Sequence, residues 1–213
     1  WRKNSYPLWM ESSDIYDSKC LGTNLVHYIA LSSAAEMGRI LGDSESAEIF
    51  DAKAQDVKKA VNEHLWMEDK GYYAQFLAGR NDDILYTKSE TLGQALAILY
   101  GVAEGERADR LSQSMPVVGF GAPVFWPWIP DQPPYHNRAV WPFVQSFWIQ
   151  ASAKTGNEEG VLHGIALVWR ACMMYATNKE NYVADDGNWK GTQVNSSNML
   201  WSLSGSLSIT FRT

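Results

Sequence analysis

Hydrophobic residues recur at helical spacing over most of the chain, with polar residues between them. One series starts after a possible capping pair, Thr23-Asn24, and ends at Gly42, and a second runs from Ser44 to Leu65. The apolar positions of the two series are Leu25, Ile29, Met37, Ile40 or Leu41, Ile49, Phe50, Ala54, Val57, Val61 and Leu65. Because only Gly42-Asp43 separates the series, they predict an antiparallel helical hairpin with an apolar stripe along each helix.

The same spacing predicts further helices along the rest of the chain. They span roughly residues 88–102, 106–114, 140–156, 157–177 and 196–211. Residues 71–77 alternate in the manner of a short strand, and strand content is otherwise small. The expected fold class is therefore all-α. Trp148 and Trp169 fall on apolar stripes, and we expect both in the core.

Short and long links alternate between these helices. Short turns at Gly42-Asp43, Gly105 and Gly156-Asn157 join the members of a pair, whereas long loops lead from one pair to the next. A ring of helical hairpins, called an (α/α) toroid, requires this alternation, and it gathers the long loops on one face. Function is expected on that face, because rigid helices position the loops.

One long loop, residues 119–143, is unusually aromatic. Loops of this length without structure of their own are uncommon unless they carry function. Its indole side chains alternate with Asn, Gln, Asp and His, which suits a ligand that is apolar on one face and hydroxylated at its edges. A sugar ring is such a ligand. The alternative is that the aromatic residues form a small core of their own beneath the loop.

Composition narrows the choice of partners. The 213 residues carry a net charge of −6, which argues against binding nucleic acid or an anionic membrane surface, since both need a basic patch. No apolar run is long enough to cross a bilayer. Cys20 and Cys172 lie far apart, and the histidines show no ligand spacing, so we expect no metal site. Gly119-x-Gly121 precedes no helix and is no phosphate cradle, and no cofactor is expected.

Four groups of segments share their order and rough spacing with a known enzyme family. They are Asn24 to Gly42; Leu65-Trp66 with Gly71-Tyr-Tyr-Ala74; Gly121 to Pro127 with Tyr135-His-Asn-Arg-Ala-Val-Trp-Pro-Phe143; and Glu180-Asn-Tyr-Val-Ala-Asp-Asp-Gly187. Together they resemble the six-hairpin (α/α) glycoside hydrolases, the group of trehalases, processing α-glucosidases and the glucosidase part of glycogen debranching enzymes. Arg138 departs from the Gly that usually follows Tyr-His-Asn in that group.

This resemblance implies that residues 1–213 are the C-terminal portion of an (α/α)6-barrel catalytic domain. A closed ring of that kind needs six hairpins, and about three are visible here. The rest of the parent chain is therefore expected to complete the toroid. The chain starts at Trp1, with neither an initiator Met nor a signal peptide, which agrees with a piece of a longer polypeptide. The resemblance also favours a secreted or periplasmic location.

The resemblance further implies a reaction that uses two carboxylic acids. One acid protonates the departing oxygen, and the other carboxylate activates water on the opposite face of the sugar, which inverts the anomeric centre. Glu180, the acidic residue of the Glu-x-Tyr segment, is the implied base. Asp185 and Asp186 are the fallback candidates. The alternative for Glu180 is an ordinary solvated carboxylate in a loop.

The general acid is expected in or just before the first segment of the chain. Trp1-Arg-Lys-Asn-Ser-Tyr-Pro-Leu-Trp-Met10 resembles a family segment that directly follows an Asp, so that the acid would be the residue preceding Trp1. Glu11 and Asp14 are the candidates within the chain, because Trp9-Met10-Glu11 resembles another family segment that carries an acid. Otherwise these two carboxylates cap local turns.

Substrate binding is predicted for residues that can stack on a sugar ring or hold its hydroxyl groups. They are Trp1, Arg2, Trp126, Trp128, Tyr135, His136, Asn137 and Trp141. The expected ligand is an oligosaccharide or another glycoside. The alternative for Trp141 is that it begins the core face of its helix.

Two other functions fit the same residues. One is a carbohydrate-binding module, or an inactive relative, that keeps the aromatic platform without working carboxylates. The other is a sugar epimerase on an (α/α) toroid, in which His136 and His163 would be the acid and the base.

Overall fold

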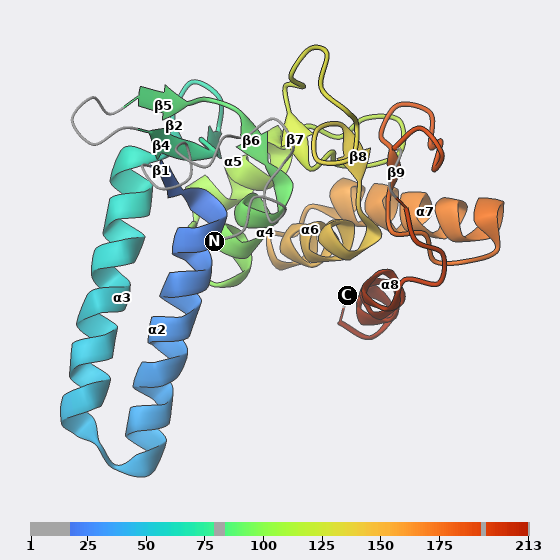
Figure 1. Ribbon diagram of the computed structural model, residues 1–213. Coiled ribbons are helices and arrows are strands. Elements are labelled where there is room, and N and C mark those ends of the chain that lie inside the picture. The colour runs from blue at the N-terminus through green and yellow to red at the C-terminus, as the bar shows by residue number, and fades with distance from the viewer. Residues whose placement is uncertain (1–17, 79–83, 193–194, 213) are drawn as a thin grey trace.

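The computed structural model describes residues 18–78, 84–192 and 195–212. The helices within these residues are α2 (Leu21–Leu41), α3 (Ser44–His64), α4 (Thr91–Leu99), α5 (Glu106–Ser114), α6 (Pro142–Lys154), α7 (Glu158–Tyr175) and α8 (Leu200–Arg212). Consecutive helices pair as hairpins, most clearly α2 with α3 and α6 with α7, as Figure 1 shows. The predicted all-α class is confirmed. Within the described ranges, no helix combines the length and hydrophobicity needed to cross a membrane.

The strands are only two or three residues long. They are β1 (Ser18–Cys20), β2 (Trp66–Met67), β3 (Tyr72–Tyr73), β4 (Phe76–Ala78), β5 (Ile84–Tyr86), β6 (Ser89–Glu90), β7 (Phe125–Trp126), β8 (Ala139–Val140) and β9 (Tyr182–Val183). The pairings are antiparallel: β1, β4 and β5 form one sheet in the order β1-β4-β5, and β2–β3, β6–β7 and β8–β9 form separate pairs. These short ladders connect loops to one another and form no layer of their own.

The turn between α2 and α3 follows the signals in the sequence. Gly42 has a φ of 76°, a left-handed conformation that costs glycine nothing, and it ends α2. The Asp43 side chain then accepts a hydrogen bond from the Ser46 N–H at 3.0 Å and caps α3. Gly42 thus ends α2, and Asp43 begins α3.

The start of α2 differs from the prediction. The helix begins at Leu21, ahead of Thr23-Asn24. β1 pairs with β4, and the next residue, Leu21, donates its N–H to the carbonyl oxygen of Gln75 at 2.8 Å. This contact starts the helix before the capping pair in the sequence. Asn24 does not cap the helix and instead donates from Nδ2 to the carbonyl oxygen of Cys20 at 2.7 Å.

The α2–α3 hairpin projects away from the rest of the chain in Figure 1. Near its tip, apolar side chains such as Met37, Ile40 and Leu41 are exposed. The two helices pack closely there through small residues, since a Cβ placed on Gly38 would lie 3.2 Å from the Cβ of Ala47. The hairpin therefore carries an uncovered apolar surface on its distal half.

The main core lies where α4 contacts α2 on one side and α6 on the other. Gln94 is a fully buried polar residue on α4. Its amide donates to the Tyr73 carbonyl oxygen at 2.7 Å and accepts from the Tyr73 N–H at 3.0 Å, which joins β3 to the helix. Both polar groups of the buried amide are thereby satisfied. This core fixes α6, the helix that follows the 119–143 loop.

The two tryptophans expected in the core have different environments. Trp148 on α6 is buried, as predicted, whereas Trp169 on α7 is 55% exposed, and that prediction is wrong. The buried residues of α7 include Leu167, Val168 and Ala171, and this face leaves Trp169 on the outer side. Periodicity identified an apolar position on α7, but α6 and α8 do not cover the Trp169 side chain.

Replacing Trp148 by Ala should leave a cavity that the surrounding helices cannot fill. We expect the free energy of unfolding, measured by urea denaturation, to fall by about 3–5 kcal/mol. Trp169→Ala is the matched control, because it removes the same side chain from an exposed position on the neighbouring helix, and it should change stability by about 0.5 kcal/mol or less. Equal losses in the two variants would contradict this description of the core.

Candidate active site

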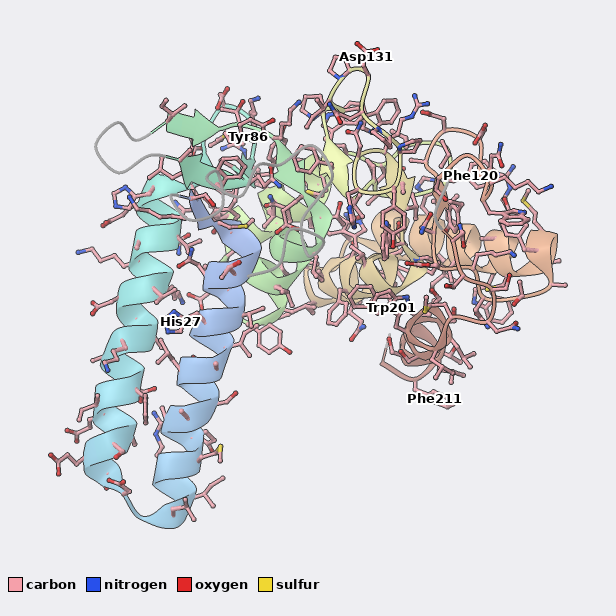
Figure 2. All side chains as sticks on the ribbon, in the orientation of Figure 1. His27, Tyr86, Phe120, Asp131, Trp201 and Phe211 are labelled. Atoms are coloured by element: carbon pink, nitrogen blue, oxygen red, sulfur yellow. The ribbon has the colours of Figure 1, made fainter. Side chains whose placement is uncertain are left out.

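Two loops meet above α6 and α7 in the view of Figure 1. One is the aromatic loop, residues 119–143, and the other is residues 178–192, which we call the Glu180 loop. They are joined by the β8–β9 pair and by a hydrogen bond of 2.8 Å from the Ala184 N–H to the Arg138 carbonyl oxygen. Asp131 marks the far tip of the aromatic loop in Figure 2. Two segments distant in sequence therefore form one surface.

Glu180 lies at this junction. The residue is only 6% exposed, and its Oε1 accepts a hydrogen bond from the Tyr135 hydroxyl at 2.5 Å. The carbonyl oxygen of Tyr135 accepts a second hydrogen bond, from Trp141 Nε1–H, at 3.0 Å. A buried carboxylate requires donors that replace its hydration, and Tyr135 is one of them. The structure thus brings together Glu180, Tyr135 and Trp141.

The neighbours of Glu180 have shifted protonation equilibria. Burial raises the pKa of Tyr135, and the hydrogen bond to Glu180 and the charge of that carboxylate raise it further. Burial lowers the pKa of His136, while the Glu180 charge acts in the opposite direction. At neutral pH, Tyr135 is therefore a protonated donor and His136 is a neutral imidazole.

Tyr135, His136 and Trp141 form a compact group that we call the aromatic cluster. Their ring centroids are 4.4 Å apart for Tyr135 and His136 and 4.9 Å apart for Tyr135 and Trp141. The His136 and Trp141 rings are stacked at 5.8 Å with an interplanar angle of 10°. Trp141 is also the N-cap residue of α6 and is buried. It therefore belongs both to the predicted site and to the core, the two roles that the sequence left open.

Asn137 is almost completely buried, with 1% of its surface exposed. Its Oδ1 accepts from the Ile129 N–H at 2.9 Å, and its Nδ2 donates to the carbonyl oxygens of Ile129 at 2.9 Å and Gln132 at 3.3 Å. The amide is used to hold the shape of the aromatic loop. Contact between Asn137 and a sugar stays a prediction, and these bonds favour a role in positioning the loop.

Trp126 and Trp128 lie edge to face, with ring centroids 5.2 Å apart. The guanidinium of Arg138 lies over the Trp128 ring at 5.6 Å and also approaches Asp185 at 3.7 Å. Arg138 stands where the resembling family usually has Gly. Its side chain therefore covers an indole face of Trp128 that a glycine would leave open.

A family model matches most of the chain, including these loops. The model of the mannosylglycerate hydrolase MGH1-like glycoside hydrolase domain matches residues 8–202. The chain belongs to this family. The match includes the aromatic loop, the Glu180 loop and all of α2 to α7.

Individual relatives are more distant. The chain is 24% identical over 108 residues to an N,N'-diacetylchitobiose phosphorylase of Vibrio proteolyticus. The matched segment is 48% of this chain and 13% of that protein. The chain is similar in fold to a GH63 mannosylglycerate hydrolase from Thermus thermophilus, with a TM-score of 0.66, 16% identity, and coverage of 92% of this chain and 45% of the other. A GH78 rhamnosidase of Bacillus gives a TM-score of 0.65, 21% identity, and coverage of 92% and 19%. The chain spans less than half the length of each of these proteins.

Four predicted site residues are not described by the structure, and the two fallback carboxylates differ from Glu180 in burial. Trp1, Arg2, Glu11 and Asp14 fall outside the described residues. Asp185 and Asp186 are exposed, in contrast to Glu180. Within residues 18–78, 84–192 and 195–212, no group of three or more His, Cys, Asp or Glu is arranged to hold a metal ion.

Trp201 adjoins the candidate site, and only its place in a predicted helix could be recognised from the sequence. It lies near the start of α8 (Figure 2), with its ring centroid 5.8 Å from that of Trp141. It also stacks on Phe143, at 5.3 Å and 15°. Trp201 is 42% exposed, so it extends the aromatic surface outward from the aromatic cluster.

The position of His136 predicts its titration. Its pKa should lie below the ordinary value of 6.5, because burial disfavours the charged imidazolium. In Glu180→Gln the pKa should fall further, since the attraction of the carboxylate is lost. Histidine ring resonances followed by NMR across pH, and assigned with His136→Asn, test both statements. A pKa that rises in Glu180→Gln would contradict the proximity of the two side chains.

Proposed function

We propose that this MGH1-like domain hydrolyses a glycosidic bond with inversion, and that Glu180 is the general base. The observation that carries the proposal is the buried Glu180 carboxylate held by Tyr135 within an aromatic cluster. Membership of a glycoside hydrolase family supports the hydrolysis of a glycosidic bond. The substrate class is an oligosaccharide or another glycoside.

The proposed reaction is a single displacement. Glu180 accepts a proton from a water molecule as the water oxygen attacks the anomeric carbon. The bond from that carbon to the departing oxygen breaks, and the departing oxygen takes a proton from a second carboxylic acid. The two carboxyl groups must stand about 6.5–9.5 Å apart, to leave room for the water. We place the acid in the segment that precedes α2, as Glu11, Asp14 or the residue before Trp1.

Tyr135 has a defined part in this proposal. Its hydroxyl donates to Oε1 of Glu180, so the carboxylate is fixed at one oxygen and the water is expected at Oε2. Its raised pKa keeps the phenol protonated over the range in which a carboxylate base works. Trp141 restrains Tyr135 in turn, through the hydrogen bond to its carbonyl oxygen. The base is thus oriented before substrate binds.

Phosphorolysis is the competing reaction, since the Vibrio relative is a chitobiose phosphorylase. In that reaction, phosphate replaces water as the group that attacks the anomeric carbon. A buried carboxylate at that position would repel the negative charge of phosphate, and the repulsion would be strong because little water screens it. The burial of Glu180 therefore favours hydrolysis.

The epimerase alternative receives little support from the placement of the histidines. His136 belongs to the aromatic cluster. His163 is exposed on α7 and lines a different hollow, together with Ser112 and Asn157. An acid and a base that act on one sugar must face the same bound ring, and these two side chains belong to separate surfaces.

Glu180→Gln in the full-length protein should lower kcat for hydrolysis by about 100-fold or more, because the general base is lost while the shape of the side chain is kept. The measurement uses a panel of glucosides and mannosides, with and without added phosphate. Asp186→Asn is the matched control, since it neutralises an exposed acid of the same loop, and its kcat should stay near that of wild type. Near-normal kcat in Glu180→Gln would remove Glu180 from the mechanism and favour a binding role.

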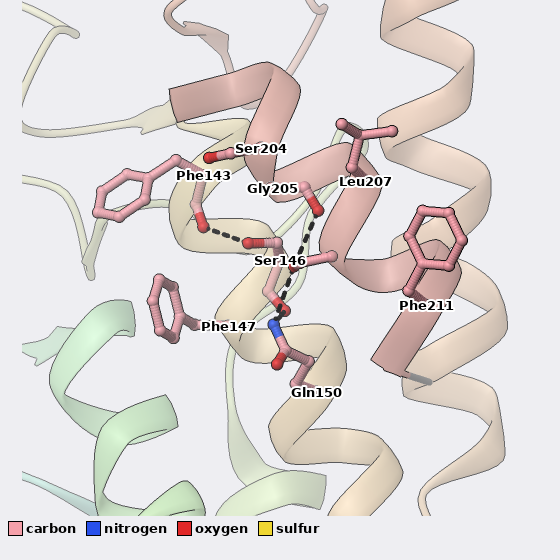
Figure 3. Close-up of a pocket in the computed structure, with 9 residues that line it drawn as sticks. Phe143, Ser146, Phe147, Gln150, Ser204, Gly205, Leu207 and Phe211 are labelled. Atoms are coloured by element: carbon pink, nitrogen blue, oxygen red, sulfur yellow. Dashed lines mark hydrogen bonds between the residues drawn. The ribbon is translucent and has the colours of Figure 1, made fainter. Parts of the chain in front are cut away.

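We also propose that a further helical part of the parent protein packs against α6 and α8 and completes the toroid. A groove of about 470 Å³ lies between these helices, as Figure 3 shows. Its apolar lining is formed by Phe143, Phe147, Leu207 and Phe211. Phe211 is 82% exposed, and uncovered apolar surface of this kind marks a contact site. The related mannosylglycerate hydrolase is more than twice as long as the part matched here, which fits an added helical portion as the occupant.

Phe211→Asp should therefore destabilise the full-length protein by about 1–3 kcal/mol, because a charge would be buried in the covered groove. Thermal unfolding followed by circular dichroism gives the change in Tm. Thr210→Asp is the control, since it introduces the same charge at the neighbouring exposed position of α8. If both substitutions leave Tm unchanged, the groove is open to solvent in the whole protein and the proposal fails.

A further inference from the structure

We propose that Asn195 is a positioning residue for the base, and that it acts by holding the main chain of Glu180. This inference rests on the proposed function of Glu180. Asn195 lies just before α8, and its Oδ1 accepts a hydrogen bond from the Glu180 N–H at 3.2 Å. The same N–H also donates to the Ser196 carbonyl oxygen at 3.0 Å. The segment that leads into α8 therefore binds the main-chain N–H of Glu180.

The other end of the Asn195 amide is anchored as well. Its Nδ2 donates to the carbonyl oxygens of Asn181 at 2.5 Å and Trp189 at 3.0 Å. Thr192 Oγ1 lies within 3.2 Å of the same nitrogen, and Asn181 and Thr192 are both fully buried. One side chain thus joins the residue next to the base, the turn that closes the Glu180 loop, and the start of α8.

The Asn195 hydrogen bonds and the β8–β9 strand pair restrain the Glu180 segment from two sides. Tyr182, two residues after Glu180, pairs with Val140 in that ladder. Glu180 is therefore held on one side through the strand pair, on the other side by Asn195, and at the tip of its side chain by Tyr135. A shift of the Glu180 backbone would move the carboxylate relative to Tyr135. Displacements of about 1 Å in a reacting group can cost about 100-fold in rate.

The groups around residue 195 require a side-chain amide of the length of asparagine. The site needs one acceptor, for the Glu180 N–H, and two donors, for the carbonyl oxygens of Asn181 and Trp189. Asparagine supplies both kinds of group from a single carbon. Aspartate has nearly the same shape but no donor, so it would place negative charge against two carbonyl oxygens. This difference makes Asn195→Asp an informative variant.

Activity provides the first test, with the full-length protein. The substrates are glycosyl fluorides of the glucosides and mannosides in the panel, since fluoride departs readily and the rate then reports on the base. Asn195→Ala and Asn195→Asp should lower kcat by about 10- to 100-fold and leave KM within about threefold, because ground-state binding is unaffected. Adding either change to Glu180→Gln should cause little further loss, since the residue acts through the carboxylate that is already absent.

Asn188→Ala is the matched control. Asn188 belongs to the same loop, and its Oδ1 accepts from the N–H groups of Lys190 and Gly191 at 2.9 and 3.2 Å, away from Glu180. We expect its kcat to stay within about twofold of wild type, as for an exposed substitution. If Asn195→Ala and Asn188→Ala lower kcat equally, or if the Asn195 effect is undiminished in Glu180→Gln, the positioning role is overturned.

The titration of His136 provides a second test that needs no substrate. If Asn195 places the Glu180 carboxylate, the pKa of His136 in Asn195→Ala should fall toward its value in Glu180→Gln, while Asn188→Ala leaves it unchanged. Asn195→Ser replaces Asn195→Ala if circular dichroism shows the alanine variant to be unfolded. An unmoved His136 pKa in a folded variant overturns the inference. Wild-type protein that hydrolyses nothing in the panel, but shows the expected His136 shift, refutes the proposed function alone.

Discussion

The pairing of β8 with β9 is the contact on which the site depends, because it ties the aromatic loop to the loop that carries Glu180. Ala139 in this pair is fully buried, so water does not compete for its hydrogen bonds. A glycine permits the close packing beside it: a Cβ on Gly121 would overlap Oε1 of Gln145, the atom that accepts the Ala122 N–H at 2.8 Å. Since Gln145 lies on α6, the loop is attached to the helical scaffold as well as to its partner loop. The site is therefore assembled from loops but positioned by helices.

Burying Glu180 at this junction has electrostatic consequences for everything around it. An isolated carboxylate in an apolar site is strongly disfavoured, so the Tyr135 hydroxyl and the surrounding network are needed to keep it there. Burial of the Tyr135 hydroxyl, with the hydrogen bond to Glu180 and its charge, raises the pKa of Tyr135 and keeps the phenol protonated. Burial of the His136 ring lowers the pKa of His136 and favours the neutral imidazole, although the Glu180 charge acts in the opposite direction. Burial and the Glu180 carboxylate thus set the protonation states of Tyr135 and His136 together.

The sequence predicts the helices well where local chemistry decides their ends. Gly42 ends α2, and Asn157 caps α7 by accepting from the Gly160 N–H, because these effects act over a few residues. Sequence-based prediction fails where contacts between distant parts of the chain determine the burial or the partners of a residue. The exposure of Trp169 could not be predicted, since periodicity shows which face is apolar and not what covers it. The Asn137 and Asn195 amides each bond to backbone groups that only the folded loops bring within reach. Resemblance to a family made Glu180 the predicted base, and it gave no information on how that residue is held.

The groove between α6 and α8 and the aromatic cluster are connected through Phe143. Its ring stacks on Trp201, which adjoins Trp141 in the aromatic cluster, and it also lines the open groove between α6 and α8. A helical segment seated in the groove would press on Phe143 and limit the freedom of Trp201. Closely packed side chains are hardly compressible, so a displacement of Phe143 would displace Trp201 as well. The covering segment would therefore fix the outer aromatic surface of the site without touching the substrate.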